Sequence, residues 1–312
     1  MKRIAPKFGI LLLAYGSPEQ LKDLGSFLSN IRGGKEFPKE VVLKFQRRYE
    51  QAGGPSPLNP ITRMQAESLE KAFQSQGKNY SFTIGMAYCE PFIKKGIQEL
   101  LEREISHLIG LPMAPHYSHL STEKYRKFFH QALKELNCSM NTSFIEYWYD
   151  EEEVLQFYSE EIDQKLKKLG EGTQLVFTAH SLPSRILKEK DQYPEQIKDH
   201  ANKIFDRLKN PPKTWHLAYQ SQGLGKEPWL GPSLEKVIED LHKREVKKIL
   251  LCPIGFACDH IEILYDLDIQ AKNQAKSLGI KLTRTPSLNS DPRFIKALQN
   301  KISRHIEKDI GK

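Results

Sequence analysis

Short apolar runs alternate with longer amphipathic stretches throughout the first half of the chain. Each apolar run has the length of a buried strand, and the stretches between them show helical spacing. We predict strands at 8–15, 82–88, 108–114 and 144–149, and helices at 60–76, 90–104 and 122–136. Alternation of strands with helices is typical of a parallel sheet that carries helices on its faces.

The second half of the chain repeats this rhythm. Its predicted strands are 175–178, 215–219, 248–253 and 281–285, and its predicted helices are 194–209, 234–244 and 259–270. We therefore predict an α/β protein with two similar domains, 1–150 and 151–290, divided near residues 150–160. A terminal helix at 291–308 is expected to return to the first half, so that residues 291–312 pack on the first domain.

A loop of similar chemistry follows an apolar strand near the start of each half. Ala-Tyr-Gly-Ser-Pro occupies 14–18, and Ala-His-Ser-Leu-Pro occupies 179–183. In open α/β sheets ligands bind beyond the carboxyl ends of the strands, so Tyr15 and His180 would face one crevice between the halves. His180 then has two interpretations: a structural loop histidine, or a base or metal ligand presented on a rigid turn.

Three polar residues, Glu262, Asp266 and Gln270, fall four positions apart in the predicted helix at 259–270. This spacing puts them on one stripe, and the apolar residues between them leave little face for solvent. The stripe is either the solvated face of an amphipathic helix or a site for metal or proton transfer. If this helix begins at the carboxyl edge of the sheet, Glu262 converges with His180. One imidazole and one carboxylate suit proton transfer, or a loosely held Fe²⁺ or Zn²⁺ ion.

Composition and charge narrow the class of protein. The chain has 312 residues, 39% hydrophobic and 28% charged, as expected of a soluble globular protein. Its longest apolar run, 10–14, is too short to span a bilayer, and the first residues lack the apolar stretch of a signal peptide, so a cytoplasmic location is expected. A net charge of +8 favours anionic partners.

Several common sites are disfavoured because their residues are missing. The four cysteines are scattered without a CxxC pair, which argues against a zinc ribbon or a disulfide framework. The Gly-Gly-Pro-Ser-Pro segment at 53–57 lacks the lysine of a phosphate-binding loop. Lysines and arginines are spread along helices without interleaved aromatic residues, so no nucleic-acid partner is expected.

Six motifs, in order along the chain, resemble those of one family, the ferrochelatases. They are Leu-Ala-Tyr-Gly-Ser-Pro at 13–18; Arg-Tyr at 48–49 with Gly-Gly-Pro-Ser-Pro-Leu at 53–58; Ala-Pro-His-Tyr-Ser at 114–118; Thr-Ala-His-Ser-Leu-Pro at 178–183; Tyr-Gln-Ser-Gln-Gly at 219–223 with Pro-Trp-Leu-Gly-Pro at 228–232; and Pro-Ile-Gly-Phe at 253–256 with Asp-His-Ile-Glu at 259–262. The resemblance implies the chelatase fold, with two similar Rossmann-like domains, parallel sheets flanked by helices, and a porphyrin cleft between the domains. It also implies a metal chelatase, a lyase of haem biosynthesis that inserts Fe²⁺ into a porphyrin with release of two protons.

By this resemblance, His180 and Glu262 take the catalytic and metal-binding positions, and Asp266 forms a relay for protons or incoming iron. Fe²⁺ is then a substrate, and no tightly bound cofactor is expected. An iron–sulfur cluster is not expected either, because no cysteine-bearing extension follows the terminal helix. The family's third in-line acid is Gln270 in this chain, and a neutral amide does not carry the charge of a relay carboxylate.

The resemblance is closest to the coproporphyrin III type of bacterial ferrochelatase. The porphyrin-binding positions of that type are matched by Tyr15, which would be the axial ligand, and by Arg32, Arg48, Tyr49, Ser56 and Tyr125. Each match also has a structural alternative as a core aromatic residue, a surface cation or a turn residue. Four propionates reward additional arginine contacts, so coproporphyrin III is favoured as the substrate. A departure is the pair Gly33 and Gly34, where those enzymes often have a second basic residue after Arg32.

Three alternative functions are kept beside this prediction. They are a protoporphyrin IX ferrochelatase that gives protohaem, a cobalt or nickel chelatase, and a non-catalytic porphyrin carrier. The expected partners are a porphyrin and Fe²⁺ as small-molecule substrates. A monomer is expected, no transmembrane segment is expected, and peripheral contact with a membrane is left open.

Overall fold

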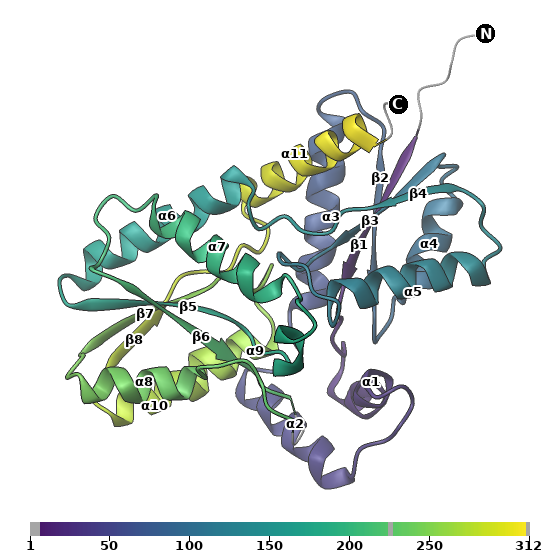
Figure 1. The fold of residues 1–312 in the computed structure, drawn as a ribbon. Helices are drawn as coiled ribbons and strands as arrows, with labels where there is room; N and C mark the ends of the chain where they lie inside the picture. The colour runs from purple at the N-terminus through teal and green to yellow at the C-terminus, as the bar shows by residue number, and fades with distance from the viewer. Residues whose placement is uncertain (1–6, 224–226, 310–312) are drawn as a thin grey trace. The chain divides into compact units, whose positions relative to one another are not determined.

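The computed structural model describes residues 7–223 and 227–309, which form two compact units (Figure 1). The first unit takes in the described residues of Met1–Ala114, His119–Trp148 and Asn289–Lys312. The second unit consists of Tyr149–Leu288, with the described residues of that range, and the short segment Pro115–Ser118. The chain therefore contributes Pro115–Ser118 to the second unit before the main part of that unit begins.

The first unit contains a parallel sheet of four strands in the order β2-β1-β3-β4. The strands are β1 (Phe8–Ala14), β2 (Ser81–Met86), β3 (His107–Pro112) and β4 (Asn141–Phe144). All seven residues of β1 are buried, as expected of an unbroken apolar run at the centre of a parallel sheet. The helices are α1 (Leu24–Ile31), α2 (Lys39–Gln51), α3 (Leu58–Gln74), α4 (Ile93–Leu101), α5 (Thr122–Glu135) and α11 (Pro292–Asp309). Figure 1 shows α4 and α5 on one face of this sheet and α3 with α11 on the other.

The second unit contains a sheet of the same kind, in the order β6-β5-β7-β8 and again parallel. The strands are β5 (Thr173–His180), β6 (Trp215–Gln220), β7 (Lys248–Pro253) and β8 (Lys281–Arg284). The helices are α6 (Glu152–Leu169), α7 (Tyr193–Phe205), α8 (Leu234–Lys243), α9 (Ile261–Leu264) and α10 (Lys272–Ser277), with a π-helical turn at Asp266–Ala271 between the last two. The predicted fold class is confirmed: both units are parallel sheets flanked by helices.

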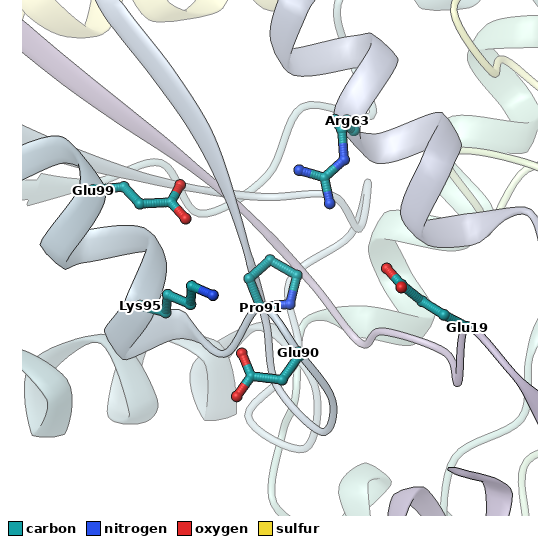
Figure 2. A pocket seen from close by; sticks show the side chains of 6 residues that line it. All are labelled: Glu19, Arg63, Glu90, Pro91, Lys95 and Glu99. Atoms are coloured by element: carbon teal, nitrogen blue, oxygen red, sulfur yellow. The ribbon is translucent and has the colours of Figure 1, made fainter. Parts of the chain in front are cut away.

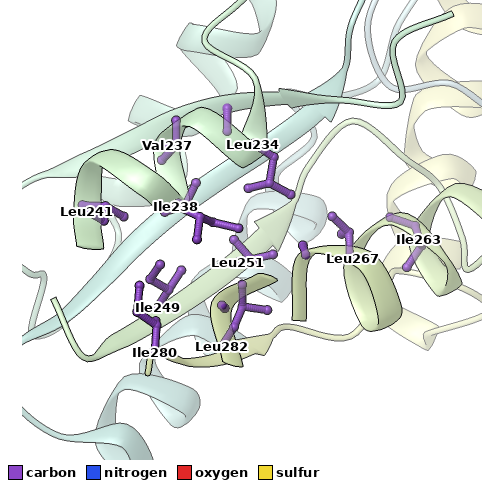
Figure 3. Packing of buried hydrophobic residues seen from close by; sticks show 14 residues of the cluster. Leu234, Val237, Ile238, Leu241, Ile249, Leu251, Ile263, Leu267, Ile280 and Leu282 are labelled. Atoms are coloured by element: carbon purple, nitrogen blue, oxygen red, sulfur yellow. The ribbon is translucent and has the colours of Figure 1, made fainter. Parts of the chain in front are cut away.

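An apolar cluster joins the sheet of the second unit to the helices on one of its faces (Figure 3). Ile249 and Leu251 come from β7, and Ile238 comes from α8. Ile263 and Leu267 come from the segment that begins with α9, and both are fully buried. The inner face of that segment is therefore held against the sheet, and its polar residues lie on the remaining faces.

The predicted fourth strand of the first half was placed too late in the chain. The structure ends β4 at Phe144, and the aromatic residues that follow form a buried connection. Trp148 packs on Phe294 with ring centroids 4.8 Å apart and donates a hydrogen bond to the carbonyl of Pro112. β4 is an edge strand with polar, half-exposed residues, so apolar content did not reveal it.

Among the described helices, α1, α2, α6 and α10 lie outside the predicted ranges. The predicted boundary at 150–160 is the beginning of α6, whose many charged residues hid the buried positions Val154, Phe157 and Ile162. α2 is largely polar and buries only Tyr49, and the short α1 was missed with it. The predicted regular helix at 259–270 is wrong in its second half, where the π-helical turn replaces the α-helix.

Among residues 7–223 and 227–309, every helix is too short or too polar to traverse a lipid bilayer.

Candidate functional site

His180 is the last residue of β5, a central strand that pairs with β6 and β7. Its Nδ1 atom forms a short hydrogen bond with the carbonyl of Ser181. A carbonyl oxygen only accepts, so Nδ1 carries a proton in this contact, and Nε2 is the nitrogen that gains or loses the second proton. The Tyr193 hydroxyl donates to the His180 carbonyl at 2.9 Å and holds the backbone at this point.

The loop after β7 approaches the backbone of His180 closely, and this approach requires a glycine. A Cβ atom built on Gly255 would lie 2.8 Å from the Cα of Ala179, a distance that side chains do not tolerate. The Gly255 amide donates to the carbonyl of Thr178 at 3.3 Å. The end of β5 and the loop that leads to α9 are therefore held in contact through backbone atoms.

Glu262, in α9, lies between two imidazoles. Its Oε1 is 3.3 Å from Nε2 of His180, and its Oε2 is 3.4 Å from Nε2 of His260. His260 is oriented like His180, because its Nδ1 donates to a backbone carbonyl, that of Cys258, at 3.1 Å. The Gln220 side chain donates to the Glu262 carbonyl at 3.0 Å. Both oxygens of one carboxylate thus face a basic nitrogen whose ring orientation is set by the backbone.

The electrostatics of this group favour an imidazolium beside a carboxylate. Burial opposes a charge on His180, but the nearby charge of Glu262, its hydrogen bond and the Ser181 carbonyl outweigh burial and raise the pKa of His180 to about 8. Burial likewise opposes ionisation of Glu262, and the imidazoles of His180 and His260 outweigh it and hold the pKa of Glu262 well below its usual range. The two side chains remain 30% and 35% exposed, so a ligand can reach them.

Asp266 lies at the start of the π-helical turn, and its carboxylate accepts a hydrogen bond from the Ser221 hydroxyl. Ser221 follows β6 in the left-handed conformation, with a φ of 60°, which a residue other than glycine adopts only rarely. Non-helical backbone of this kind and π-helical turns are both common at functional sites.

The predicted stripe of Glu262, Asp266 and Gln270 is not a regular one. Within the π-helical turn, the amide of Gln270 donates to the carbonyl of Tyr265, five residues earlier, at 2.9 Å. The extra residue per turn shifts Gln270 relative to Asp266, and the Gln270 side chain is exposed. The regular α-helix predicted through these three residues is therefore interrupted between Asp266 and Gln270.

The first unit contains the residues that the resemblance assigned to porphyrin binding. Tyr15 follows β1, is 42% exposed, and packs on Tyr88 with ring centroids 4.6 Å apart. Arg32 and Arg48 are exposed at the ends of helices. The Arg32 guanidinium lies over the ring of Phe37, 4.4 Å from its centroid.

The other three assigned residues are buried in the first unit. The Tyr49 hydroxyl is 3.2 Å from the hydroxyl of Ser17, and the Ser56 hydroxyl accepts a hydrogen bond from the amide of Leu58 at 3.4 Å. Tyr125 belongs to the apolar cluster between the sheet and α4 and α5. Their role in binding a porphyrin stays a prediction.

The candidate metal-binding donors are few. In the described part of the chain, no group of three or more histidine, cysteine, aspartate or glutamate side chains is arranged to hold a metal ion. Within the described residues, the carboxylate of Glu262 faces Nε2 of His180 at 3.3 Å and Nε2 of His260 at 3.4 Å. A mixed nitrogen and oxygen set of this size suits Fe²⁺ or Zn²⁺ in transit, and the same atoms can accept protons.

A separate hollow of about 240 Å³ lies on the surface of the first unit (Figure 2). Its lining combines three carboxylates with two cations and a proline: Glu19, Arg63, Glu90, Pro91, Lys95 and Glu99. None of the residues predicted from the sequence as site residues lines it.

Sequence reasoning missed two members of the group around Glu262. His260 was quoted within a motif but was given no role, and nothing in the sequence shows which way its ring points. Ser221 was also part of a motif, and its hydroxyl bonds to a residue 45 positions away. A histidine two residues before a candidate acid was the available signal for His260.

Comparisons with known proteins agree on one family. The ferrochelatase family pattern matches residues 7–306. A ferrochelatase of Deinococcus radiodurans is 34% identical over 300 residues, covering 95% of this chain and 95% of the relative. A coproporphyrin III ferrochelatase of Listeria innocua is 34% identical over 300 residues, covering 94% and 96%.

Solved structures agree on the fold. SirB from Bacillus subtilis, solved with Fe³⁺, has a TM-score of 0.62 at 13% identity and covers 98% of both chains. CbiX, described as the terminal enzyme for biosynthesis of sirohaem in denitrifying bacteria, has a TM-score of 0.58 at 12% identity, covering 95% of this chain and 98% of its own. Identities this low carry the fold alone, and that fold is the one predicted from the sequence.

Proposed function

This chain belongs to the ferrochelatase family, and from that membership we propose that it inserts Fe²⁺ into coproporphyrin III. It is an enzyme that inserts a metal into a porphyrin. Fe²⁺ enters as a substrate, and the product is the iron porphyrin with two protons released. The protein needs no resident cofactor for this reaction, because neither oxidation nor reduction occurs.

The observation that carries the proposal is the carboxylate of Glu262 between two oriented imidazoles. Two pyrrole N–H bonds must break while four bonds form between iron and nitrogen. A base with a pKa near the working pH accepts such protons most effectively, and the pKa of His180 is about 8. His180 accepts a pyrrole proton at Nε2, and Glu262 stabilises the resulting imidazolium and contacts the iron before it is transferred.

Glu262 suits the contact with iron better than His180 in the resting protein. Its low pKa keeps it ionised at neutral pH, whereas His180 is then largely protonated and lacks a free lone pair at Nε2. Arrival of a divalent cation at Glu262 opposes the positive charge on His180 and favours release of its proton. The same imidazole is then free to accept a proton from the porphyrin.

The choice of coproporphyrin rests on the charges of the first unit. Coproporphyrin III has four propionates, whereas protoporphyrin IX has two. Arg32 and Arg48 are exposed cations that can bind carboxylates in a bidentate manner, and Tyr15 is an exposed phenol that can contact the iron product. Relatives of comparable similarity include enzymes named for coproporphyrin III.

The test is a side-by-side rate measurement under anaerobic conditions. Purified protein receives Fe²⁺ with either coproporphyrin III or protoporphyrin IX, and the change from the porphyrin to the iron-porphyrin spectrum is followed. We expect many turnovers, faster with coproporphyrin III. Stoichiometric binding without turnover would contradict the enzyme, and a faster rate with protoporphyrin IX would contradict the proposed substrate.

A further inference from the structure

Arg284 makes an ion-pair network beneath the segment that carries Glu262. Its Nε and Nη2 atoms donate to the two oxygens of Asp268, each at 2.8 Å, and Nη2 is also 3.2 Å from Oδ1 of Asp259. Nη1 donates to the carbonyl of Thr285 at 3.1 Å. The Arg284 side chain is 16% exposed, and such a two-pronged contact fixes direction as well as distance.

The backbone of Arg284 is itself fixed by the sheet. Arg284 is the last residue of β8 and lies opposite Leu251 of β7. The amide of Thr285 continues this pairing by donating to the carbonyl of Leu251 at 2.9 Å. The guanidinium therefore projects from a rigid part of the second unit.

The two carboxylates that Arg284 binds lie on either side of the site residues in the sequence. Asp259 comes directly before His260, and Asp268 comes two residues after Asp266 and within the π-helical turn. Ile263 and Leu267 anchor the inner face of this segment in the apolar cluster (Figure 3), whereas a two-pronged ion pair adds directional contacts. The ion pairs of Arg284 with Asp259 and Asp268 supply these directional contacts at both ends of the segment.

Arg284 binds a residue of the π-helical turn and so stabilises its unusual backbone. A π-helical turn is rare and is kept only where the surroundings support it. Asp268 is one of its six residues, and its carboxylate is bound on both oxygens by Arg284. If the turn relaxed to an α-helix, the residues before it would rotate, and Glu262 would lose its place between the imidazoles of His180 and His260.

We propose that Arg284 is a positioning residue for metal insertion: by binding Asp259 and Asp268 it holds the 259–268 segment so that Glu262 faces His180 and His260. This proposal depends on the proposed function only in taking iron insertion as the reaction that Arg284 supports. The geometric part concerns the protein without substrate and can be measured separately. Arg284 contacts neither His180 nor Glu262 in the distances above, so it acts through the backbone of this segment.

The test compares Arg284→Lys with a matched control, Arg207→Lys. Lysine keeps the positive charge but cannot bind one carboxylate at two points. Arg207 resembles Arg284, because its Nε and Nη2 bind the two oxygens of Glu152 and its Nη1 binds the carbonyl of Lys203. That contact joins the turn after α7 to the start of α6 in the same unit and involves no residue of the site.

We expect kcat for iron insertion to fall about 10- to 100-fold in Arg284→Lys, with the KM for coproporphyrin III within about twofold of the original value. Arg207→Lys should leave both constants unchanged. A second readout needs no substrate: in protein labelled with ¹⁵N-histidine, at a fixed pH of 6, the Nε2 proton of His180 should give a downfield signal. We expect this signal to shift strongly in Arg284→Lys and not in Arg207→Lys.

An unchanged kcat and an unchanged His180 signal in Arg284→Lys would overturn the proposal, since charge alone would then suffice. Asp268→Asn is the second variant, to be used if Arg284→Lys does not fold. It weakens the same contact from the other side and should shift the His180 signal in the same direction. If the wild-type protein inserted no iron and Arg284→Lys still shifted the His180 signal, the proposed function would be contradicted and the positioning role would remain.

Discussion

The two units have the same strand order but place different chemistry at the same point. In each unit, the second residue of the helix after the third strand is a glutamate. It is Glu123, after Thr122, in α5, and Glu262, after Ile261, in α9. In the first unit, Glu123 faces Arg126 at 3.5 Å. In the second unit, Glu262 faces two imidazoles.

The difference shows that the neighbour, rather than the position in the fold, determines what a carboxylate can do. A guanidinium keeps its proton at any ordinary pH, so Arg126 has no proton to exchange with Glu123. An imidazole gains and loses a proton near neutral pH. Only the pair in the second unit can therefore accept protons from a porphyrin and respond to an incoming cation.

The backbone differs at the same point. α5 runs without interruption over Thr122–Glu135, whereas the corresponding stretch of the second unit changes to a π-helical turn after α9. The interruption brings Asp266 to the hydroxyl of Ser221. The second unit thus departs from regular helix geometry where its polar side chains gather.

The largest expected effect comes from replacing each of the two glutamates with its amide. Glu262→Gln keeps the shape of the side chain but removes the charge that faces His180. We expect kcat for iron insertion to fall by about 10²- to 10⁴-fold, the range usual for a lost acid–base partner. Glu123→Gln should change kcat by less than about twofold, because its partner Arg126 exchanges no proton. Similar losses in both variants would remove the distinction between the units.

The pH dependence of insertion gives the second effect. If neutral His180 accepts a pyrrole proton and its pKa is about 8, about 1% of the protein is competent at pH 6 and about half at pH 8. We expect kcat/KM to rise about 50-fold over this interval in anaerobic rate measurements. A flat profile from pH 6 to pH 8 would show that His180 does not supply the base.

The raised pKa of His180 also predicts that stability falls as the pH rises, whereas the rate increases. His180 has a raised pKa in the folded protein, so its stabilising contribution is complete below about pH 6.5 and is lost as the pH rises through about 8. We expect the wild-type protein to lose up to about 2 kcal/mol of unfolding free energy between pH 6 and pH 9 in urea titrations. Glu262→Gln should lose less, and Glu123→Gln should lose as much as the wild type. If the wild-type protein and Glu262→Gln had the same unfolding free energy at both pH 6 and pH 9, the pair of His180 and Glu262 would not contribute to stability.

The smallest expected effect concerns substrate choice and involves the first unit. Arg48→Ala should weaken binding of coproporphyrin III by about 1.5 kcal/mol, or about tenfold in KM, because a charged contact to a propionate is lost. Protoporphyrin IX, with fewer propionates, should be affected less. Arg47→Ala, an exposed arginine on the same helix, is the control and should not discriminate between the porphyrins. Equal weakening of both porphyrins by Arg48→Ala would assign it a structural role.

The sequence predicted the fold best where strands are buried on both sides. β1, β5 and β7 each contain a buried apolar run, and each was found within a few residues of its observed bounds. β4 was misplaced because an edge strand needs no apolar content, and the buried Trp148 that follows it packs on Phe294 of α11 instead. The burial of the segment after β4 depends on packing against residues far away in the sequence, and no local sequence pattern reveals such packing.

The candidate site was predicted in part for a similar reason. Strand ends and a polar residue in an apolar helix are local signals, and they brought His180 and Glu262 together correctly. The orientation of His260 depends on a backbone carbonyl, and Arg284 reaches Asp268 from 16 residues away. The π-helical turn also lies beyond sequence reasoning, because the spacing of Glu262, Asp266 and Gln270 fits an α-helix equally well.

The most direct test of the central claim is iron insertion by His180→Ala. The variant receives coproporphyrin III and Fe²⁺ under anaerobic conditions, and porphyrin binding is followed in the same sample by the quenching of porphyrin fluorescence. We predict that binding stays measurable while insertion is abolished, because the base at the end of β5 is gone. Near-normal insertion by His180→Ala would contradict the assignment of the reaction to the second unit.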